Sequence, residues 1–232
     1  MGGFKNIVLL LLFVMSCTPS SGEYLKDTTE HTIAYVSSFT SNATRLSREA
    51  TVKILAFDSR GNRIGGSGAY VKYKQHHFVL TAAHVVDAGD SALVISDREK
   101  VIAEVVYINT ETDIAVLRIE GLFTRRPLVW RPTGTLVGTP VVYTGFPNNT
   151  GLLSIQGTVS GFVGKNIILD SYAWGGSSGS VVLDKRGRII GIVSAIDIGY
   201  AFGKYPQLLE DVVLIASIQN LKEEDLLDSL SN

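Results

Sequence analysis

Short apolar runs rich in Val, Ile, Phe and Tyr recur between turn-forming residues along most of the chain. Runs of this kind, bounded by Gly, Asn, Asp and Ser, are typical of β-strands. A first group lies at 51–57, 69–73, 77–81, 92–96, 101–108 and 114–119, and a second group lies at 140–144, 153–162, 166–169, 180–183 and 188–194. Two clusters of about six short strands predict an all-β fold of two six-stranded antiparallel barrels, at about 50–130 and 135–215.

Two polar segments predict hairpin turns, and the end of the chain predicts a helix. Residues 58–62 separate the first two strands, and residues 184–187 join the last two predicted strands. Near the end of the chain, Leu221, Leu226 and Leu230 lie close to helical spacing. A C-terminal helix is therefore expected at about 218–230.

The N-terminal segment has the pattern of an export signal. An apolar run at 7–15 follows Lys5, and it has the length of a secretory core but is short for a membrane span. The run ends at Val14-Met15-Ser16-Cys17, which resembles the bacterial lipobox, in which the cysteine is lipidated and becomes the new N-terminus. Alternatively, Cys17 lies within or just after an ordinary signal peptide and has no role. We expect a signal segment at 1–17, a Ser- and Thr-rich tether and lead-in at 18–47, and a folded domain at 48–232.

Composition narrows the class of function. The chain has 232 residues, which suffices for one well-buried domain, and its formal net charge is −1. Because no basic run could follow a phosphate backbone, nucleic acid is not an expected partner. Cys17 is the only cysteine, so the folded domain has no disulfide and depends on burial of its core. His76 and His77 lack metal-ligand spacing, and we expect neither a metal nor a cofactor.

Three segments carry the residues that peptide-bond hydrolysis needs. They are Thr81-Ala82-Ala83-His84, Thr112-Asp113-Ile114-Ala115-Val116-Leu117 and Gly175-Gly176-Ser177-Ser178-Gly179-Ser180. The reaction requires a nucleophile, a base and a carboxylate that orients the base, and the order His, Asp, Ser is one of the known orders of such a triad. Each segment alone has a plainer explanation: a structural histidine, a turn aspartate or a flexible Gly/Ser loop. Their order within an all-β chain argues against coincidence.

The local patterns fit these roles chemically. The glycines around Ser178 allow a tight turn in which the hydroxyl projects outward and successive amides point at one spot, as in an oxyanion hole. Asp113 lies at the mouth of an apolar strand, where a carboxylate needs hydrogen bonds. The Nδ1 proton of His84 would supply one of them.

Together these segments resemble the trypsin-like, chymotrypsin-fold serine proteases. Gly66-Ser67-Gly68-Ala69 and Asp170 are most similar to the Deg-type and glutamyl-endopeptidase branches. The resemblance implies that Ser178 is the nucleophile, His84 the base and Asp113 the orienting carboxylate, and that the backbone amides of Gly176 and Ser178 form the oxyanion hole. It also implies a terminal helix docked on the second barrel. The segment after the last strand is too short for the PDZ module that many Deg-type proteases carry.

The same resemblance implies a substrate pocket. Tyr172, six residues before Ser178, would lie at its base, with Ser194, Ala195 and Ile196 along one wall. Because no acidic residue occupies the base, a preference for Arg or Lys is not expected. A small or medium apolar side chain is the expected substrate residue.

The predicted function is that of a serine endopeptidase that acts on protein or peptide substrates outside the cytoplasm. It would be held in the periplasm or cell envelope as a membrane-anchored lipoprotein through Cys17, or else be secreted. The alternative is a surface binding protein that keeps the protease fold with a weak or inactive site. A self-cleaving processing protease is a third, weaker hypothesis, because the chain offers no polyprotein context.

Overall fold

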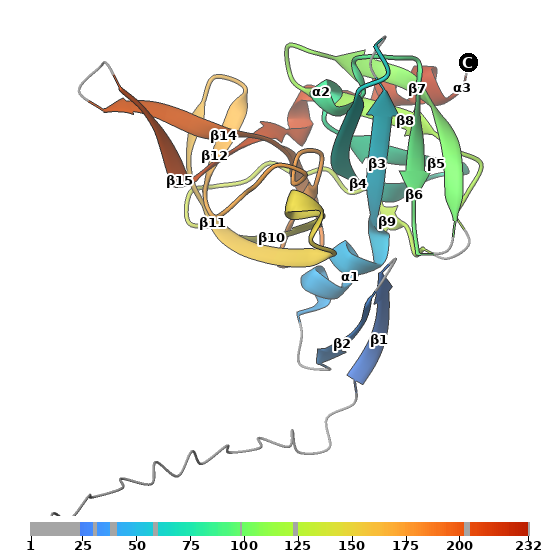
Figure 1. Cartoon of the computed structure of the whole chain (residues 1–232), viewed down its shortest axis with the longest axis horizontal. Helices are drawn as coiled ribbons and strands as arrows, with labels where there is room; N and C mark the ends of the chain where they lie inside the picture. The colour runs from blue at the N-terminus through green and yellow to red at the C-terminus, as the bar shows by residue number, and fades with distance from the viewer. Residues whose placement is uncertain are drawn as a thin grey trace, which may run out of the picture.

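The structure is a computed structural model, and it describes residues 24–29, 32–37, 41–57, 60–97, 99–122, 125–201 and 205–231. Cys17 and the predicted signal segment lie outside these residues. Two β-barrels lie side by side, one with strands coloured blue to green and the other yellow to red (Figure 1). The all-β prediction with two antiparallel barrels is confirmed. Within the described ranges, no helix combines the length and the apolar character that crossing a membrane requires.

The first barrel closes because its first two strands pair with each other. Its six strands are β3 (Thr51–Phe57), β4 (Arg63–Tyr73), β5 (His76–Thr81), β6 (Ser91–Ile95), β7 (Lys100–Asn109) and β8 (Ile114–Arg118). A short strand β9 (Leu128–Val129) adds to β4 in parallel. Along β3, Val52, Ile54 and Ala56 are buried in the core, and the alternate residues face outward.

The second barrel is a closed ring in the order β10-β11-β12-β15-β14-β13. Its strands are β10 (Pro140–Gly145), β11 (Leu153–Val163), β12 (Asn166–Asp170), β13 (Val181–Asp184), β14 (Ile189–Ala201) and β15 (Tyr205–Ser217). Its core contains Tyr143, Leu169, Ile190 and Ile215, all nearly or completely buried. The sequence analysis ended β14 at Ser194 and did not predict β15.

An unpredicted helix, α1 (Asn42–Ala50), connects the two barrels. Ser41 caps it by accepting a hydrogen bond from the Thr44 backbone N–H at 3.2 Å. From its buried face, Ser47 Oγ donates to Thr144 Oγ1 of β10 at 2.8 Å. The segment was predicted only as lead-in because its buried residues are small or polar and form no apolar stripe. Before α1, β1 (Tyr24–Thr29) and β2 (Thr32–Ser37) form an antiparallel pair.

The C-terminal helix is present, but it packs differently from the expectation. A 3₁₀ turn at Ile218–Asn220 precedes α3 (Glu223–Ser231), so the predicted continuous helix is two pieces. Leu221, Leu226 and Leu230 join the larger core cluster, which contains the buried residues of the first barrel and some of the second. The helix α3 itself lies beside β7 of the first barrel (Figure 1). The predicted docking on the second barrel is therefore wrong, since the apolar spacing defines a buried face but not the surface that covers it.

Candidate active site

Ser178 lies in a tight loop between β12 and β13 whose shape depends on two glycines. Gly176 and Gly179 have φ values of +95° and +87°, a region that residues with a side chain rarely adopt. A Cβ on Gly176 would collide with the Phe146 carbonyl oxygen, and one on Gly179 would collide with the Ser67 carbonyl and the Thr81 hydroxyl. Both glycines are thus required by backbone angle and by space.

The hydrogen bonds of this loop orient its amides. The Asn148 N–H donates to the Gly175 carbonyl at 2.6 Å, and the Ser180 N–H donates to the Ser177 carbonyl at 3.0 Å. In a trans peptide the N–H points opposite to the carbonyl before it, so the N–H groups of Gly176 and Ser178 point away from these contacts. Neither amide donates to an acceptor among the described residues. The two donors are available for an anionic oxygen, which is the arrangement expected of an oxyanion hole.

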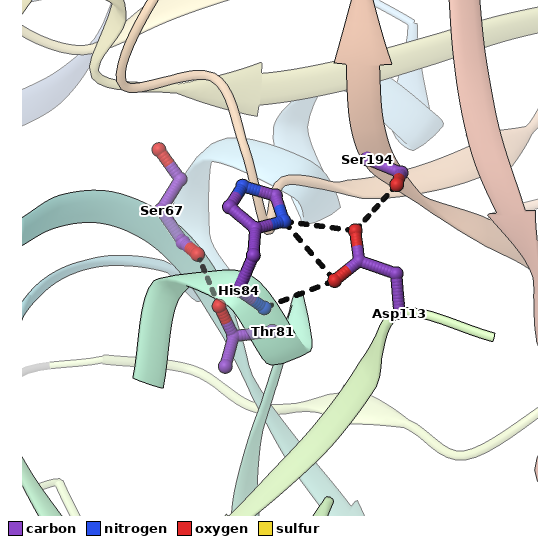
Figure 2. Close-up of polar contacts among 5 residues, drawn as sticks. All are labelled: Ser67, Thr81, His84, Asp113 and Ser194. Atoms are coloured by element: carbon purple, nitrogen blue, oxygen red, sulfur yellow. Dashed lines mark hydrogen bonds and ion pairs between the residues drawn. The ribbon is translucent and has the colours of Figure 1, made fainter. Parts of the chain in front are cut away.

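Ser67 of β4 attaches this loop to the first barrel. Its backbone N–H donates to the Ser178 carbonyl at 2.8 Å, and its hydroxyl donates to the Gly176 carbonyl at 2.7 Å. Ser67 is itself held by the Thr81 hydroxyl, which donates to the Ser67 carbonyl at 2.8 Å (Figure 2). The sequence analysis noted Ser67 only as part of a family motif and missed its bridging role.

His84 and Asp113 meet at the rim of the first barrel. His84 lies in the short helix α2 (Ala83–Val86), directly after β5, and Asp113 lies directly before β8. The His84 Nδ1 atom is 3.0 Å from Asp113 Oδ1 and 2.9 Å from Oδ2, and the His84 backbone N–H donates to Oδ1 at 3.0 Å (Figure 2). Asp113 has φ +54°, an uncommon value for a residue with a side chain. The carboxylate thus fixes both the ring and the backbone of His84.

Ser194 of β14 adds a third contact from the second barrel, because its hydroxyl donates to Asp113 Oδ2 (Figure 2). The sequence analysis assigned Ser194 to the pocket wall and missed this contact. No sequence signal indicated it, since Ser194 simply ends a predicted apolar strand. The placement of Ser194 along the pocket wall stays a prediction, and its hydroxyl is engaged with the carboxylate.

The electrostatics of the pair follow from these contacts. The hydrogen bond to Asp113 raises the pKa of His84 above its ordinary value, although burial opposes this shift. Burial acts to raise the pKa of Asp113, but the hydrogen bonds from His84 and Ser194 outweigh it and hold that pKa below its ordinary value. Asp113 is therefore charged at neutral pH and favours the His84 tautomer with a proton on Nδ1. The Nε2 atom of a neutral His84 can then accept a proton.

Gly66 lies between the backbone of Ser178 and the helix α2 that carries His84. A Cβ on Gly66 would lie 2.7 Å from the Val85 methyl groups and 3.0 Å from the Ser178 carbonyl oxygen, so only glycine fits between them. No hydrogen bond joins Ser178 Oγ to His84 within the described part of the chain. Such contacts are often loose in a protease without substrate.

The structure describes the side chains of two of the four predicted pocket residues, Tyr172 and Ser194. Tyr172 is 53% exposed, and its ring stacks on Trp174 with centroids 6.3 Å apart. The Tyr143 hydroxyl donates to the Tyr172 carbonyl and holds its backbone. Ala195 and Ile196 belong to β14, but their side chains lie outside the described residues. Tyr172 therefore forms an exposed aromatic pair with Trp174, and its position at the base of a substrate pocket stays a prediction.

Comparison with known proteins identifies the family. A family model described as the trypsin-like peptidase domain matches residues 66–192, more than half of the chain. The chain belongs to the trypsin-like peptidases. The matched residues include His84, Asp113 and Ser178, so the peptidase domain spans both barrels.

Relatives of this trypsin-like peptidase are bacterial. It is 30% identical over 129 residues to a protein of Pseudomonas savastanoi described as a periplasmic serine endoprotease, DegP-like. It is 31% identical over 154 residues to the serine protease HhoA of a Synechocystis species. The matches cover 51% and 59% of this chain, but 27% and 39% of the relatives. The chain thus matches less than half the length of either relative.

A solved structure supports the fold. The Rv3671c protease of M. tuberculosis in its active form superimposes with a TM-score of 0.63 and 19% identity, covering 82% of this chain and 83% of that chain. At this identity, the likeness bears on the fold alone. It agrees with the two closed barrels and the C-terminal helix described above.

Proposed function

We propose that this chain is a serine endopeptidase that cleaves protein or peptide substrates through Ser178, His84 and Asp113. The observation that carries the proposal is the hydrogen-bonded pair His84–Asp113, completed by Ser194, together with the Ser178 loop, in which the Gly176 and Ser178 amides donate to no described acceptor. In this arrangement, different hydrogen bonds hold the base His84, the carboxylate of Asp113 and the loop that carries the two amide donors. The family match, which contains all three residues, supports the same roles.

In the proposed mechanism, His84 Nε2 accepts the proton of the Ser178 hydroxyl as Ser178 Oγ attacks the substrate carbonyl. The negative charge that develops on the carbonyl oxygen is stabilised by the Gly176 and Ser178 amides. His84 then gives the proton to the leaving amine, and an acyl-enzyme forms on Ser178. Water repeats the sequence with His84 again as base, which releases the acid product and restores the Ser178 hydroxyl. Asp113 stays ionised throughout and stabilises the protonated imidazole.

The proposal extends to location. The apolar run at 7–15 and the Val14-Met15-Ser16-Cys17 segment support export with lipidation at Cys17, and the match to a relative described as periplasmic agrees with export. In this proposal, residues 1–17 act as a signal segment and residues 18–47 as tether and lead-in to the peptidase domain at 48–232. The enzyme then faces protein substrates in the cell envelope.

The test compares the purified protein with Ser178→Ala on a denatured protein substrate. We expect cleavage by the unchanged chain and none above background by Ser178→Ala, while Ser160→Ala cleaves normally. Ser160 is a suitable control because it is an exposed serine on β11 of the same barrel. Cleavage that survives Ser178→Ala would overturn the mechanism. An unchanged chain that binds protein but cleaves nothing would favour the alternative, a protease-fold binding protein.

A further inference from the structure

A cleft of about 260 Å³ opens beside the Gly176 end of the Ser178 loop. One wall is the outward face of the β3–β4 hairpin, which contributes Lys53, Arg63 and Gly65. The opposite wall comes from the second barrel, where Asn148 and Gly176 line the cleft. The cleft therefore lies between the barrels and next to a predicted oxyanion donor.

The cleft lies on the leaving-group side of the bond to be cut. Its lining includes Gly66, which separates the Ser178 carbonyl from Val85, the neighbour of His84. His84 must stand beside the leaving amine in order to protonate it. The expected pocket for the acyl side involves Tyr172 and β14, and neither contributes to this cleft. A substrate whose carbonyl oxygen contacts the Gly176 amide would therefore extend the residues after the cut bond into the cleft.

The described lining of the cleft includes cationic side chains. Among the described residues that line it, Lys53 and Arg63 are charged and none is a carboxylate. Arg63 is exposed, and no described carboxylate forms an ion pair with it. Because a carboxylate loses part of its water on entering a cleft, it is favoured there only beside a cation.

The floor of the cleft is open at Gly65. A Cβ there would have only one neighbour within 4 Å, Leu55 Cδ2 at 3.7 Å, which is an ordinary contact, and the backbone of Gly65 needs no positive φ. Neither packing nor backbone angle therefore requires glycine at this position. The missing side chain leaves space between Arg63 and the Ser178 loop.

From these observations we infer that Arg63 selects substrates with an acidic side chain within the first three residues after the cut bond. The inference rests on the proposed function, because it needs Ser178 as the nucleophile. It names a substrate class: protein segments in which Asp or Glu closely follows the cleaved bond.

The test is cleavage of a peptide library derived from a whole proteome, with both sides of each cut read by mass spectrometry. Cleavage is normalised to the fraction of molecules that a fluorophosphonate labels at Ser178. We expect Asp and Glu to be enriched about threefold to fivefold over Lys and Arg after the cut, as for a partly exposed charge pair. Arg63→Gln should abolish the enrichment, and Arg63→Glu should reverse it toward Lys and Arg.

Two further variants test whether the preference depends on the cleft itself and not on a general change of surface charge. Lys72→Glu replaces a cation by a carboxylate, as Arg63→Glu does, but on an exposed residue of β4 nine positions after Arg63. This variant should keep the preference for acidic residues. Gly65→Val retains Arg63 but fills the floor of the cleft, and should also abolish the preference. No enrichment by a labelled enzyme, or enrichment that persists in Arg63→Glu, would overturn the inference. Failure of the unchanged chain to take the label would overturn the proposed function itself.

Discussion

At the scale of single residues, the site depends on hydrogen bonds that orient one imidazole ring. Asp113 accepts from the ring and backbone of His84 and from the Ser194 hydroxyl. These three donors keep the carboxylate ionised and in place although it is partly buried. The chemistry proposed for Ser178 therefore depends on a residue that does not touch the substrate.

Asp113→Asn tests this dependence. An amide nitrogen cannot accept the Nδ1 proton, and an amide that turns its N–H₂ toward the ring favours the wrong tautomer of His84. We expect the turnover number to fall about 10⁴-fold, as for the same change in other proteases of this type, while the melting temperature changes little. Steady-state kinetics and thermal unfolding measure the two quantities. Near-normal turnover in this variant would remove Asp113 from the mechanism.

The pH profile tests the state of His84. Only the neutral imidazole accepts a proton, so kcat/KM should rise as pH increases through the pKa of His84. Because Asp113 raises that pKa, the midpoint should lie above about 6.5, the ordinary value for histidine. In Asp113→Ala the residual activity should have a lower midpoint, because the opposing effect of burial remains. A profile that is flat from about pH 5 to 8, with chemistry rate-limiting, would contradict a histidine base.

At the scale of elements, the Ser178 loop is held in shape by close approach to β4 and β5. Gly179 packs against Ser67 and Thr81, and Ser67 in turn donates to Gly176. The Ser178 loop is thus packed directly against the end of β5, the strand that leads to His84. Four other glycines with positive φ, namely Gly61, Gly138, Gly151 and Gly164, have open space where a Cβ would lie, so they need only the backbone angle.

Gly179→Ala and Gly164→Ala separate these two requirements. Both glycines have positive φ, +87° and +55°, but a Cβ on Gly164 would meet nothing within 4 Å. Gly164→Ala should cost about 1 kcal/mol of unfolding free energy, the usual penalty for a strained backbone. Gly179→Ala should cost more than about 3 kcal/mol and abolish activity, since the backbone of Ser67 must move. Equal losses in denaturant-induced unfolding would show that close packing at Gly179 is unimportant.

At the scale of the whole molecule, the site is shared between two barrels. His84, Asp113 and Ser67 come from the first barrel, and Ser194 comes from the second (Figure 2). Ser178 also comes from the second barrel, between β12 and β13. The hydrogen bonds Ser67–Ser178 and Ser194–Asp113 cross between them. Helix α1 also contacts both barrels, so it supports the site without touching it.

The proposed anchor is expected to act independently of this assembly. Cys17→Ser should move the enzyme from the membrane fraction to the soluble fraction, because lipid chains would provide the attachment. The kinetic constants should stay the same, since residues 18–47 separate the anchor from the barrels in sequence. Fractionation and mass spectrometry of the N-terminal peptide measure both. An unmodified N-terminus, or one that begins after Cys17, would contradict the lipid anchor.

Sequence reasoning predicted the strands whose faces are apolar and missed the elements stabilised in other ways. β3 and β8 have buried runs that a linear pattern reveals. Helix α1 was missed because its buried side chains are small or polar, and β15 because Pro206, Gln207 and Glu210 interrupt its apolar character. In the site, motif order indicated Ser178, His84 and Asp113. The contact of Ser194 with Asp113 depends on docking of the barrels, which no local pattern encodes.

The central claim is that Ser178 is a nucleophile activated by His84, and an active-site label tests it most directly. The purified chain is treated with a fluorophosphonate, and the modified residue is mapped by mass spectrometry. The account predicts one adduct per chain, located on Ser178, formed quickly above the pKa of His84 and strongly slowed in His84→Ala. An adduct on another serine, or labelling of Ser178 at an undiminished rate in His84→Ala, would contradict the account.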